Sequence, residues 1–298
     1  MEESENTDKI IKNIVISGGG HSIITFYGIL KRANKMNFYK YENIESIYGT
    51  SAGALVGCIL SLNIDWEVLD KYIIERPWEK VFYLNIQQVF SMFDNMGIFS
   101  KKHIVEVLKP LLMSKDLSVD ITLEELYQQT KIDFHAYGSE LNSSTMTDFS
   151  HTSHPHWKVV DAVYISCAIP FIFRPFFHED CCYIDGCITN DFPVKECLES
   201  HNIDETFFIK KEFNYNYLIN ENSPFVNYMN TLIQKLLIKK TEYTKPKYIV
   251  FVNDDACTLD DIIKLASSKD MREEMILNGI KMMDTFLHSI EYFVDEYI

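Results

Sequence analysis

Two stretches near the start of the chain share one order of apolar, small and helix-forming residues. The first is apolar and β-branched from Ile10, runs into three glycines at 18–20, and continues into a helix predicted over residues 24–36. The second is apolar over residues 44–48, passes through GTSAG, and leads into a segment rich in alanine and leucine over residues 52–62. A buried parallel strand, a tight loop and a helix produce this pattern. Two such units predict an α/β fold with a mostly parallel central sheet flanked by helices.

The rest of the chain continues to alternate between helix and strand patterns. Residues 66–129 are predicted to be mainly helical, with an interruption at Pro110, and residues 132–149 alternate as strands do. Beyond them the pattern predicts a helix over 157–167, strands over 182–185, 205–210 and 248–252, and an amphipathic helix over 276–294.

The chain reads as one domain, because no internal repeat, low-complexity segment or flexible linker divides it. We expect a polar tail over residues 1–10, a core over residues 11–200, and strands and helices over residues 201–298 that pack on the same domain. With 298 residues, of which 47% are hydrophobic and 24% charged, the chain can bury a substantial core.

Charge narrows the range of partners. The chain has 43 acidic and 28 basic side chains, a formal net charge of −15. Proteins bind nucleic acids mainly through lysine and arginine, so no nucleic-acid partner is expected. The same charge disfavours broad adhesion to an anionic membrane, although a local basic or apolar face is still compatible with it.

The sequence predicts a cytoplasmic protein with at most peripheral contact to membranes. The amino terminus, MEESENTDKI, is acidic where a secretory signal is basic and then apolar. The longest strongly apolar stretches are far shorter than the roughly 18 residues that a membrane-spanning helix needs. Seven cysteines without a recurring spacing indicate free thiols in a reducing compartment. The oligomeric state is left open.

The GTSAG segment contains the first candidate for chemistry, Ser51. It lies between a predicted strand and a predicted helix, where a sharp turn presents a serine as a nucleophile. Gly49 and Gly53 fit this geometry, because side chains at those positions would collide with neighbouring backbone. The amino end of the following helix would also favour negative charge at the site. By itself the pattern equally fits a small-residue turn that packs a helix on a sheet.

The three glycines at 18–20 offer a second candidate. Glycines at a strand end leave backbone N–H groups open to a developing negative charge. A dinucleotide-binding loop is a weaker interpretation, because Ile23 would occupy the place of its third glycine. The third candidate is Asp185, which leaves an apolar strand and is followed by Gly186. It fits a rigidly held carboxylate, but taken in isolation it fits a turn aspartate that bonds its own backbone better.

Together these features resemble the patatin-like phospholipases, a family of lipid acyl hydrolases. That family has a glycine-rich oxyanion loop, a GxSxG nucleophile elbow and a DG[GA] motif in this order. Here 31 residues separate Gly18 from Gly49, and 134 separate Ser51 from Asp185. The segment SCAIPFIFRPF and the pattern Asn-x-x-Pro at 190–193 add to the likeness, which covers about two thirds of the chain.

The resemblance implies a three-layer sandwich and a Ser51–Asp185 dyad that cleaves fatty acyl esters of phospholipids through an acyl-enzyme. It also implies an oxyanion hole at Gly18, Gly19, Gly20 and His21, an elbow shaped by Gly49 and Gly53, and supporting roles for Gly186 and Asn190. It implies neither a cofactor nor a metal. The expected partner is a phospholipid or another acyl-ester lipid.

Three positions depart from the family pattern. Ser22 and Ile23 stand where members commonly have a basic residue and a glycine, and Cys187 is the third residue of the DG[GA] motif. The lost basic residue leaves one positive charge fewer near the oxyanion or a lipid phosphate. Two alternatives therefore stay open beside a phospholipase: a neutral-glyceride lipase or general carboxylesterase, and an inactive lipid-binding or interaction protein.

Other residue clusters do not indicate a competing chemistry. A Ser-His-Asp triad needs a histidine at a strand end after the acid, whereas His201 lies in a polar turn and His288 within the terminal helix. The histidines at 151, 154 and 156, and the cysteines at 181, 182, 187 and 197 beside His178, lack the spacing of familiar metal sites.

Two segments bear on the substrate. The aromatic-rich residues 78–99 fit a buried wall better than a lid or an interfacial surface. The lysine-rich residues 235–247 fit a solvated helix end better than a head-group contact.

Overall fold

A single eight-stranded sheet organises the chain. The computed structural model describes residues 10–214, 219–236, 246–255 and 257–295. In spatial order the strands are β10 (Ile249–Asp255), β9 (Thr206–Asn214), β1 (Asn13–Ile16), β2 (Ser46–Thr50), β4 (Asp133–Glu140), β8 (Cys181–Asp185) and β7 (Phe176–His178), and β5 (Thr145–Phe149) pairs with β4. β9 and β10, from the last third of the sequence, thus extend the sheet beyond β1.

The strand directions determine where loops meet. β10, β9, β1, β2 and β4 are parallel, whereas β5, β8 and β7 run antiparallel to their neighbours. Ile16 at the end of β1 pairs in register with Gly49 near the end of β2. The loops that follow β1 and β2 therefore leave the same edge of the sheet.

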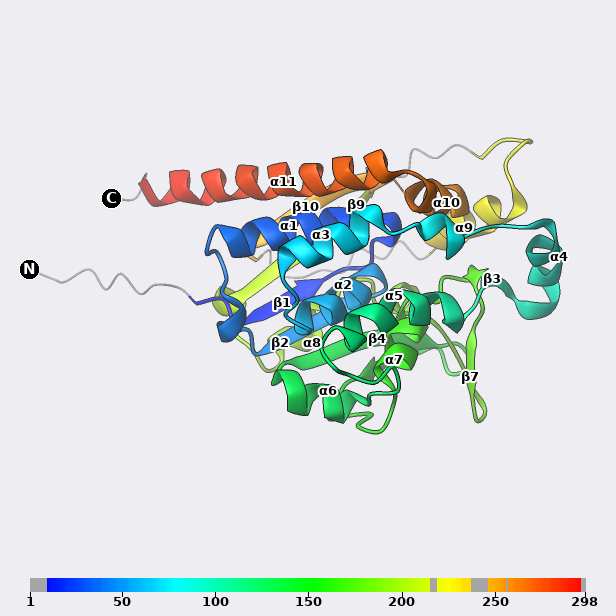
Figure 1. Cartoon of the computed structure of the whole chain (residues 1–298), viewed down its shortest axis with the longest axis horizontal. Coiled ribbons are helices and arrows are strands. Elements are labelled where there is room, and N and C mark those ends of the chain that lie inside the picture. Colours follow the sequence, from blue (N-terminus) through cyan, green and yellow to red (C-terminus); the bar gives the residue numbers. More distant parts are fainter. Residues whose placement is uncertain (1–9, 215–218, 237–245, 256, 296–298) are drawn as a thin grey trace, which may run out of the picture.

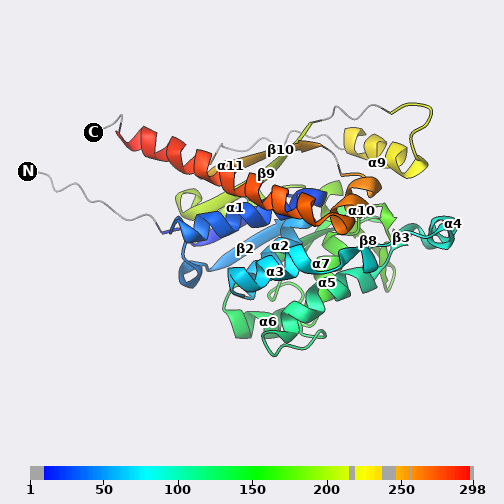
Figure 2. The same ribbon diagram turned by 45° about the horizontal axis from the view of Figure 1, so that its top comes forward.

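Helices cover both faces of the sheet unequally (Figures 1 and 2). The larger layer contains α1 (Ile23–Lys35), α2 (Ala52–Ser61), α3 (Trp66–Glu75), α5 (Lys101–Met113), α7 (Val159–Ser166) and α11 (Lys269–Asp295). On the opposite face α8 (Val194–Leu198) and the loop before it pack on a smaller core. Along β1 the side chains alternate, so Ile14 and Ile16 face the larger core and Val15 the smaller one.

The predicted fold class is confirmed: a mixed α/β fold with a central sheet between helical layers. The structure adds a second sheet, in which β3 (Gly97–Phe99) pairs with β6 (Phe171–Phe173), that the pattern of residues 66–129 did not predict. Strands this short leave almost no periodicity to detect. The remaining helices are α4 (Ile86–Asn95), α6 (Leu123–Thr130), α9 (Phe225–Leu236) and α10 (Leu259–Ser267).

The expected interruption at Pro110 is wrong, because α5 continues through this residue to Met113. Proline cannot donate a hydrogen bond to the carbonyl of Glu106, four residues earlier. Instead Arg76 Nη1 donates to that carbonyl oxygen at 2.9 Å. A side chain from outside the helix thus replaces the missing backbone donor, which no local pattern reveals.

The terminal helix α11 lies along α1 through two facing glycines (Figure 2). A Cβ atom at Gly28 would overlap the carbonyl oxygen of Ile276, and a Cβ atom at Gly279 would overlap that of Thr25. Because neither position has room for a methyl group, the two helices pack backbone to backbone. This contact attaches the carboxyl-terminal segment to the first helix of the fold.

We expect Gly279→Val to destabilise the protein by about 1–3 kcal/mol, the usual cost of overfilling a tight core contact. The free energy of unfolding in urea measures the effect. Leu277→Ala, at an exposed position of the same helix, serves as the control. Equal stability of both variants and the wild type would show that the two helices do not pack as closely as described.

Candidate active site

Ser51 occupies a strained turn between β2 and α2. Its backbone has φ +54° and ψ −121°, a region that residues with a side chain rarely adopt. A Cβ atom at Gly49 would lie 2.6 Å from the backbone nitrogen of Ala54, and one at Gly53 would overlap the carbonyl oxygen of Ile16. The two predicted elbow glycines thus allow α2 to begin directly against the ends of β1 and β2.

Asp185 reaches Ser51 from the other side of β4. Thr50, the last residue of β2, pairs with Tyr137, and Asp185, the last residue of β8, pairs with Gly138. Because β8 runs antiparallel, its final residue returns to the point where β2 ends. Ser51 Oγ donates a hydrogen bond to Asp185 Oδ2 at 2.6 Å.

The Asp185 side chain is buried and held by the backbone around it. Its Oδ1 accepts a hydrogen bond from the N–H of Cys187 at 2.8 Å. Its own N–H donates to the carbonyl of Ala168 at 2.9 Å, and its carbonyl oxygen accepts from Ser139 Oγ at 2.8 Å. Burial raises the pKa of the Asp185 carboxyl to about 6, although the hydrogen bonds from Ser51 and Cys187 lower it. The result is a carboxylate more basic than an exposed one.

A second set of contacts fixes the Ser51 backbone. Ser166 Oγ accepts a hydrogen bond from the Ser51 N–H at 2.8 Å and donates to the carbonyl of Tyr137 at 2.5 Å. The thiol of Cys167 donates to the Ser51 carbonyl at 3.2 Å. Sequence reasoning gave these two residues only as part of a family-like segment, because their proximity to Ser51 depends on how α7 crosses the sheet.

The glycine loop lies beside Ser51. A Cβ atom at Gly18 would lie 3.6 Å from the Cβ of Ser51 and would overlap the sulfur of Cys187. The N–H of Gly18 donates to the carbonyl of Asp191 at 2.8 Å, so this predicted oxyanion donor is already engaged. Gly20, with φ +54°, lines the same cavity as Ser51. Gly20 is therefore better placed than Gly18 to face a ligand at Ser51.

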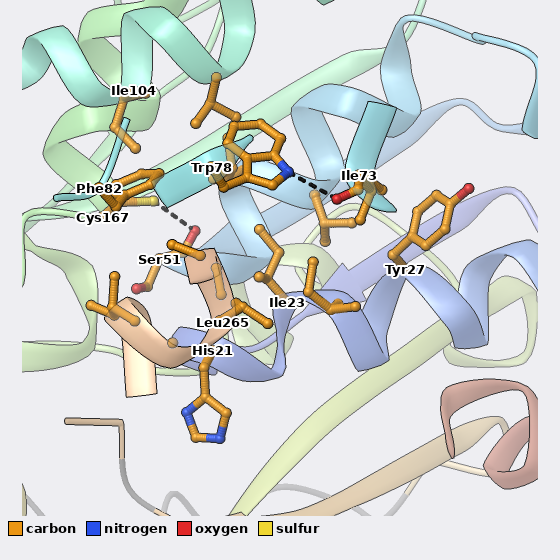
Figure 3. A pocket seen from close by; sticks show the side chains of 18 of the residues that line it. His21, Ile23, Tyr27, Ser51, Ile73, Trp78, Phe82, Ile104, Cys167 and Leu265 are labelled. Carbon is orange, nitrogen blue, oxygen red and sulfur yellow. Dashed lines mark hydrogen bonds between the residues drawn. The ribbon is translucent and has the colours of Figure 1, made fainter. Parts of the chain in front are cut away.

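His21 turns its imidazole away from Ser51 (Figure 3). Its Nε2 lies 3.0 Å from Asp254 Oδ2, and Ser22 Oγ donates to the same oxygen at 2.7 Å. Burial opposes protonation of His21, but interactions with Asp254 and Cys257 outweigh it and raise the pKa of the imidazole to about 9. His21 is thus a cation paired behind the loop, and any contribution of this residue to an oxyanion hole falls to its backbone.

The predicted supporting residues connect the motifs. The Thr50 hydroxyl donates to the carbonyl of Asn190 at 3.1 Å, which ties the loop after Asp185 to the residue before Ser51. At Gly186 a Cβ atom would overlap the carbonyl oxygen of Tyr137. Sequence reasoning did not identify Lys211, a fully buried lysine on β9 whose Nζ donates to the Gly19 carbonyl at 3.1 Å. The sequence feature that could have indicated Lys211 is a pair of lysines inside the otherwise apolar strand FFIKKEF.

Ser51 opens into an apolar cavity of about 180 Å³ (Figure 3). Aliphatic and aromatic side chains from five α-helices, strand β6 and the connecting segments form most of its wall: Ile23, Tyr27, Leu55, Val56, Ile59, Ile73, Ile104, Val107, Ile262 and Leu265, with Trp78, Phe82 and Phe173. None of the described residues that line it is acidic. The acidic side chains of the described residues therefore lie outside the wall of this cavity.

The aromatic-rich residues 78–99 divide into two parts. Trp78 and Phe82 line the cavity, and Trp78 Nε1 donates to the carbonyl of Ile73 at 2.8 Å, as the predicted buried wall requires. α4, in the middle of the segment, instead exposes Phe90 and Phe93. A single sequence segment thus supplies both a wall and an exposed apolar surface.

The clustered histidines bond neighbouring polar groups. His151 Nδ1 lies 2.9 Å from Asp133 Oδ1, and His154 Nδ1 lies 2.9 Å from the carbonyl of Asp148. Among the described residues, no group of three histidine, cysteine or acidic side chains is placed to hold a metal ion. Most of the lysine-rich residues 235–247 lie outside the described part of the chain.

The chain is similar to known proteins in sequence. A family model described as patatin-like phospholipase matches residues 14–198. The chain is 24% identical over 196 residues to "Probable lipid hydrolase 463L" of Invertebrate iridescent virus 6, which covers 65% of this chain and 66% of the relative. It is 23% identical over 199 residues to "Uncharacterized protein R571" of Acanthamoeba polyphaga mimivirus, which covers 67% of this chain and 65% of the relative. The chain thus spans just under two thirds of the length of these relatives.

The fold also has a counterpart among solved structures. It is similar to the crystal structure of VipD from Legionella pneumophila, with a TM-score of 0.53 and 15% sequence identity. The likeness covers 94% of this chain and 67% of that one. At this identity it supports the arrangement of sheet and helices.

The raised pKa of Asp185 predicts a pH-dependent gain in stability for Asp185→Asn. The carboxyl holds its proton more tightly in the folded state than in the unfolded state. Its protonated form therefore contributes fully to folding stability below the unfolded pKa of 3.8, and this contribution is lost as the pH rises through about 6. We therefore expect the free energy of unfolding of Asp185→Asn to be higher than that of the wild type at pH 7.5, by on the order of 3 kcal/mol. Near pH 4 the two proteins should be about equally stable.

Urea unfolding at the two pH values measures this difference. Asp180→Asn, an exposed position on the turn before β8, is the control and should change little at either pH. A wild type that is more stable than Asp185→Asn at pH 7.5 would contradict the unfavourable burial of this carboxylate.

Proposed function

Since the chain belongs to the patatin-like phospholipase family, we propose that it is a lipid acyl hydrolase that cleaves fatty acyl esters of phospholipids. One observation carries the proposal: Ser51 lies 2.6 Å from a buried carboxylate and faces an apolar cavity. The name of one relative, a probable lipid hydrolase, supports the same activity. An apolar wall without acidic groups suits a fatty acyl chain.

In the proposed mechanism Asp185 is the general base. It accepts the proton of the Ser51 hydroxyl while Ser51 Oγ attacks the ester carbonyl carbon. The tetrahedral intermediate collapses, the alcohol leaves with the proton from Asp185, and the acyl group stays on Ser51. Asp185 then deprotonates a water molecule that attacks the acyl-enzyme, and the fatty acid leaves while Ser51 recovers its proton. The raised pKa of Asp185 makes it a better base for both steps.

Backbone N–H groups are the proposed partners of the oxyanion. The glycine loop supplies Gly19, Gly20 and His21, of which Gly20 and His21 line the cavity. Ala52, the first residue of α2, has an N–H group at the positive end of that helix. Donors that are fixed before the reaction stabilise the charge that develops in the transition state.

The Ser51–Asp185 pair leads to the prediction that Ser51→Ala and Asp185→Asn each abolish release of fatty acid from phospholipid micelles. The loss follows because the first variant lacks the nucleophile and the second lacks the base. Ser61→Ala, at the far end of α2, is the matched control, because its hydroxyl bonds only within that turn to the carbonyl of Cys58 in the described contacts. Retained activity in either purified site variant would exclude the dyad.

A fluorophosphonate that labels Ser51 separates an enzyme from an inactive lipid-binding protein. Wild-type labelling that disappears in Ser51→Ala supports the enzyme. Phospholipid, triglyceride and a short-chain nitrophenyl ester, assayed side by side, then distinguish a phospholipase from a glyceride lipase or a general carboxylesterase.

We further propose that α4 docks the protein on a lipid bilayer. Its residues Ile86, Phe90 and Phe93 lie at helical spacing on one face and are 72%, 71% and 69% exposed. Phe225 of α9 adds to this surface, with its ring centroid 6.4 Å from that of Phe93. In Figure 1, α4 lies at the end of the molecule where β3 and α10 are found, and α10 helps to line the cavity.

Exposed apolar side chains that lie close together suit an interface with acyl chains. Their insertion needs no attraction to anionic lipid, which agrees with the acidity of the chain. Within the described residues, no helix is long and apolar enough to span a bilayer. Peripheral contact through α4 is therefore the proposed mode of access to the substrate.

The triple variant Ile86→Gln, Phe90→Gln and Phe93→Gln should bind phosphatidylcholine vesicles at least about tenfold more weakly, because burying each side chain contributes up to about 1.5–3 kcal/mol. Sedimentation with vesicles measures binding, and a soluble short-chain ester reports on the intact site. Met113→Gln, an exposed apolar residue at the end of α5, is the control. Unchanged vesicle binding in the triple variant would exclude α4 as the docking surface.

A further inference from the structure

The glycine loop lacks the basic residue that a patatin-like loop commonly carries after it, yet a buried positive charge contacts this loop from elsewhere. Lys211 of β9 is 1% exposed, and its Nζ donates to the Gly19 carbonyl at 3.1 Å. Its backbone N–H donates to Ser17 Oγ at 2.8 Å. β9 also pairs with β1, the strand that leads into the loop. The lysine is therefore anchored to the loop through both its side chain and its backbone.

The contact acts on one peptide group. The carbonyl of Gly19 and the N–H of Gly20 belong to the same planar trans unit and point in opposite directions. The Gly19 oxygen accepts hydrogen bonds from Lys211 Nζ and from the N–H of Ser22 at 3.1 Å. With the oxygen held toward β9, the N–H of Gly20 is directed away from Lys211. Gly20 and Ser51 line the same cavity.

A carboxylate lies near the buried lysine. Lysine is almost never fully buried without a compensating group. Here Asp254 of the neighbouring strand β10 is within electrostatic reach of Lys211 and bonds His21 and Ser22. Burial disfavours the charged form of Asp254, but His21, Ser22 and the Lys211 charge hold the pKa of this carboxyl well below its usual range. The glycine loop and the two residues after it are thus bound by Lys211 of β9 and Asp254 of β10.

We propose that Lys211 is the positioning residue of the oxyanion hole: it fixes and polarises the Gly19–Gly20 peptide so that the Gly20 N–H is aimed at Ser51. A charged donor on the carbonyl strengthens the N–H of the same peptide as a donor. The lysine supplies from β9 the positive charge that Ser22 does not. The inference rests on the proposed function, because only a reaction at Ser51 creates the oxyanion.

Lys211→Met tests the proposal, since it removes the ammonium group but keeps most of the apolar stem. We expect kcat for ester hydrolysis to fall about 10- to 100-fold, up to the range for a lost oxyanion donor, while KM changes less than about threefold. Affinity for a long-chain trifluoromethyl ketone, whose adduct with Ser51 carries an oxyanion, should fall by a similar factor. Affinity for a long-chain alcohol, which fills the cavity without an oxyanion, should not change.

Lys210→Met is the matched control. Lys210 is the adjacent residue on β9, and its Nζ lies 5.2 Å from the ring centroid of Phe192, in the smaller core on the other face of the sheet. This variant should keep wild-type kcat and both affinities.

The outcomes separate this inference from the proposed function. A Lys211→Met protein with wild-type kcat, or one that loses alcohol and ketone affinity equally, would overturn the role of Lys211 while the hydrolase proposal stands. A wild-type protein that reacts with neither ester nor ketone would overturn both. If Lys211→Met does not fold, Lys211→Gln replaces it as the test. A fall in kcat of at least about fivefold, with a parallel loss of ketone affinity, would then support the role of Lys211, and wild-type values would overturn it.

Discussion

The buried hydrogen bond between Ser51 and Asp185 is the constraint on which the rest of the site depends. A carboxylate buried at this point is costly, and its pKa near 6 records that cost. The N–H of Cys187 offsets part of this cost by donating a hydrogen bond to the carboxylate. The N–H of Asp185 itself donates to the carbonyl of Ala168, which holds its backbone in place. The same burial makes Asp185 a stronger base, so the instability and the proposed reactivity share one physical origin.

Close packing around this pair explains the small residues of the motifs. The ends of β1, β2 and β8 converge where a Cβ atom at Gly53 or Gly186 would overlap a carbonyl oxygen. Cys187, which departs from the family pattern, has its sulfur where a side chain at Gly18 would lie. A larger third residue in the DG[GA] motif is therefore accommodated by the glycine loop opposite it, without displacing Asp185.

The last third of the chain contributes directly to the site, although the family match ends at residue 198. β9 and β10 extend the sheet and bring Lys211 and Asp254 behind the glycine loop, α10 lines the cavity, and the contact of α11 with α1 attaches this segment to the fold. A basic residue thus contacts the loop from β9, although Ser22 stands where the family commonly has one. Among the described residues, no acidic side chain lines the cavity, so none there opposes an apolar ligand.

The sequence by itself determined the α/β fold and the two strand, loop and helix units, because strand periodicity and glycine turns are local properties. It named Ser51 and Asp185 as a pair only through the resemblance of its motifs to a known family. It did not determine the continuation of α5 through Pro110, the engaged N–H of Gly18, or the places of Ser166 and Lys211 beside the motifs. Each of these depends on a contact between residues far apart in the chain. Only the tertiary structure decides such contacts, since strand register and helix packing bring those residues together.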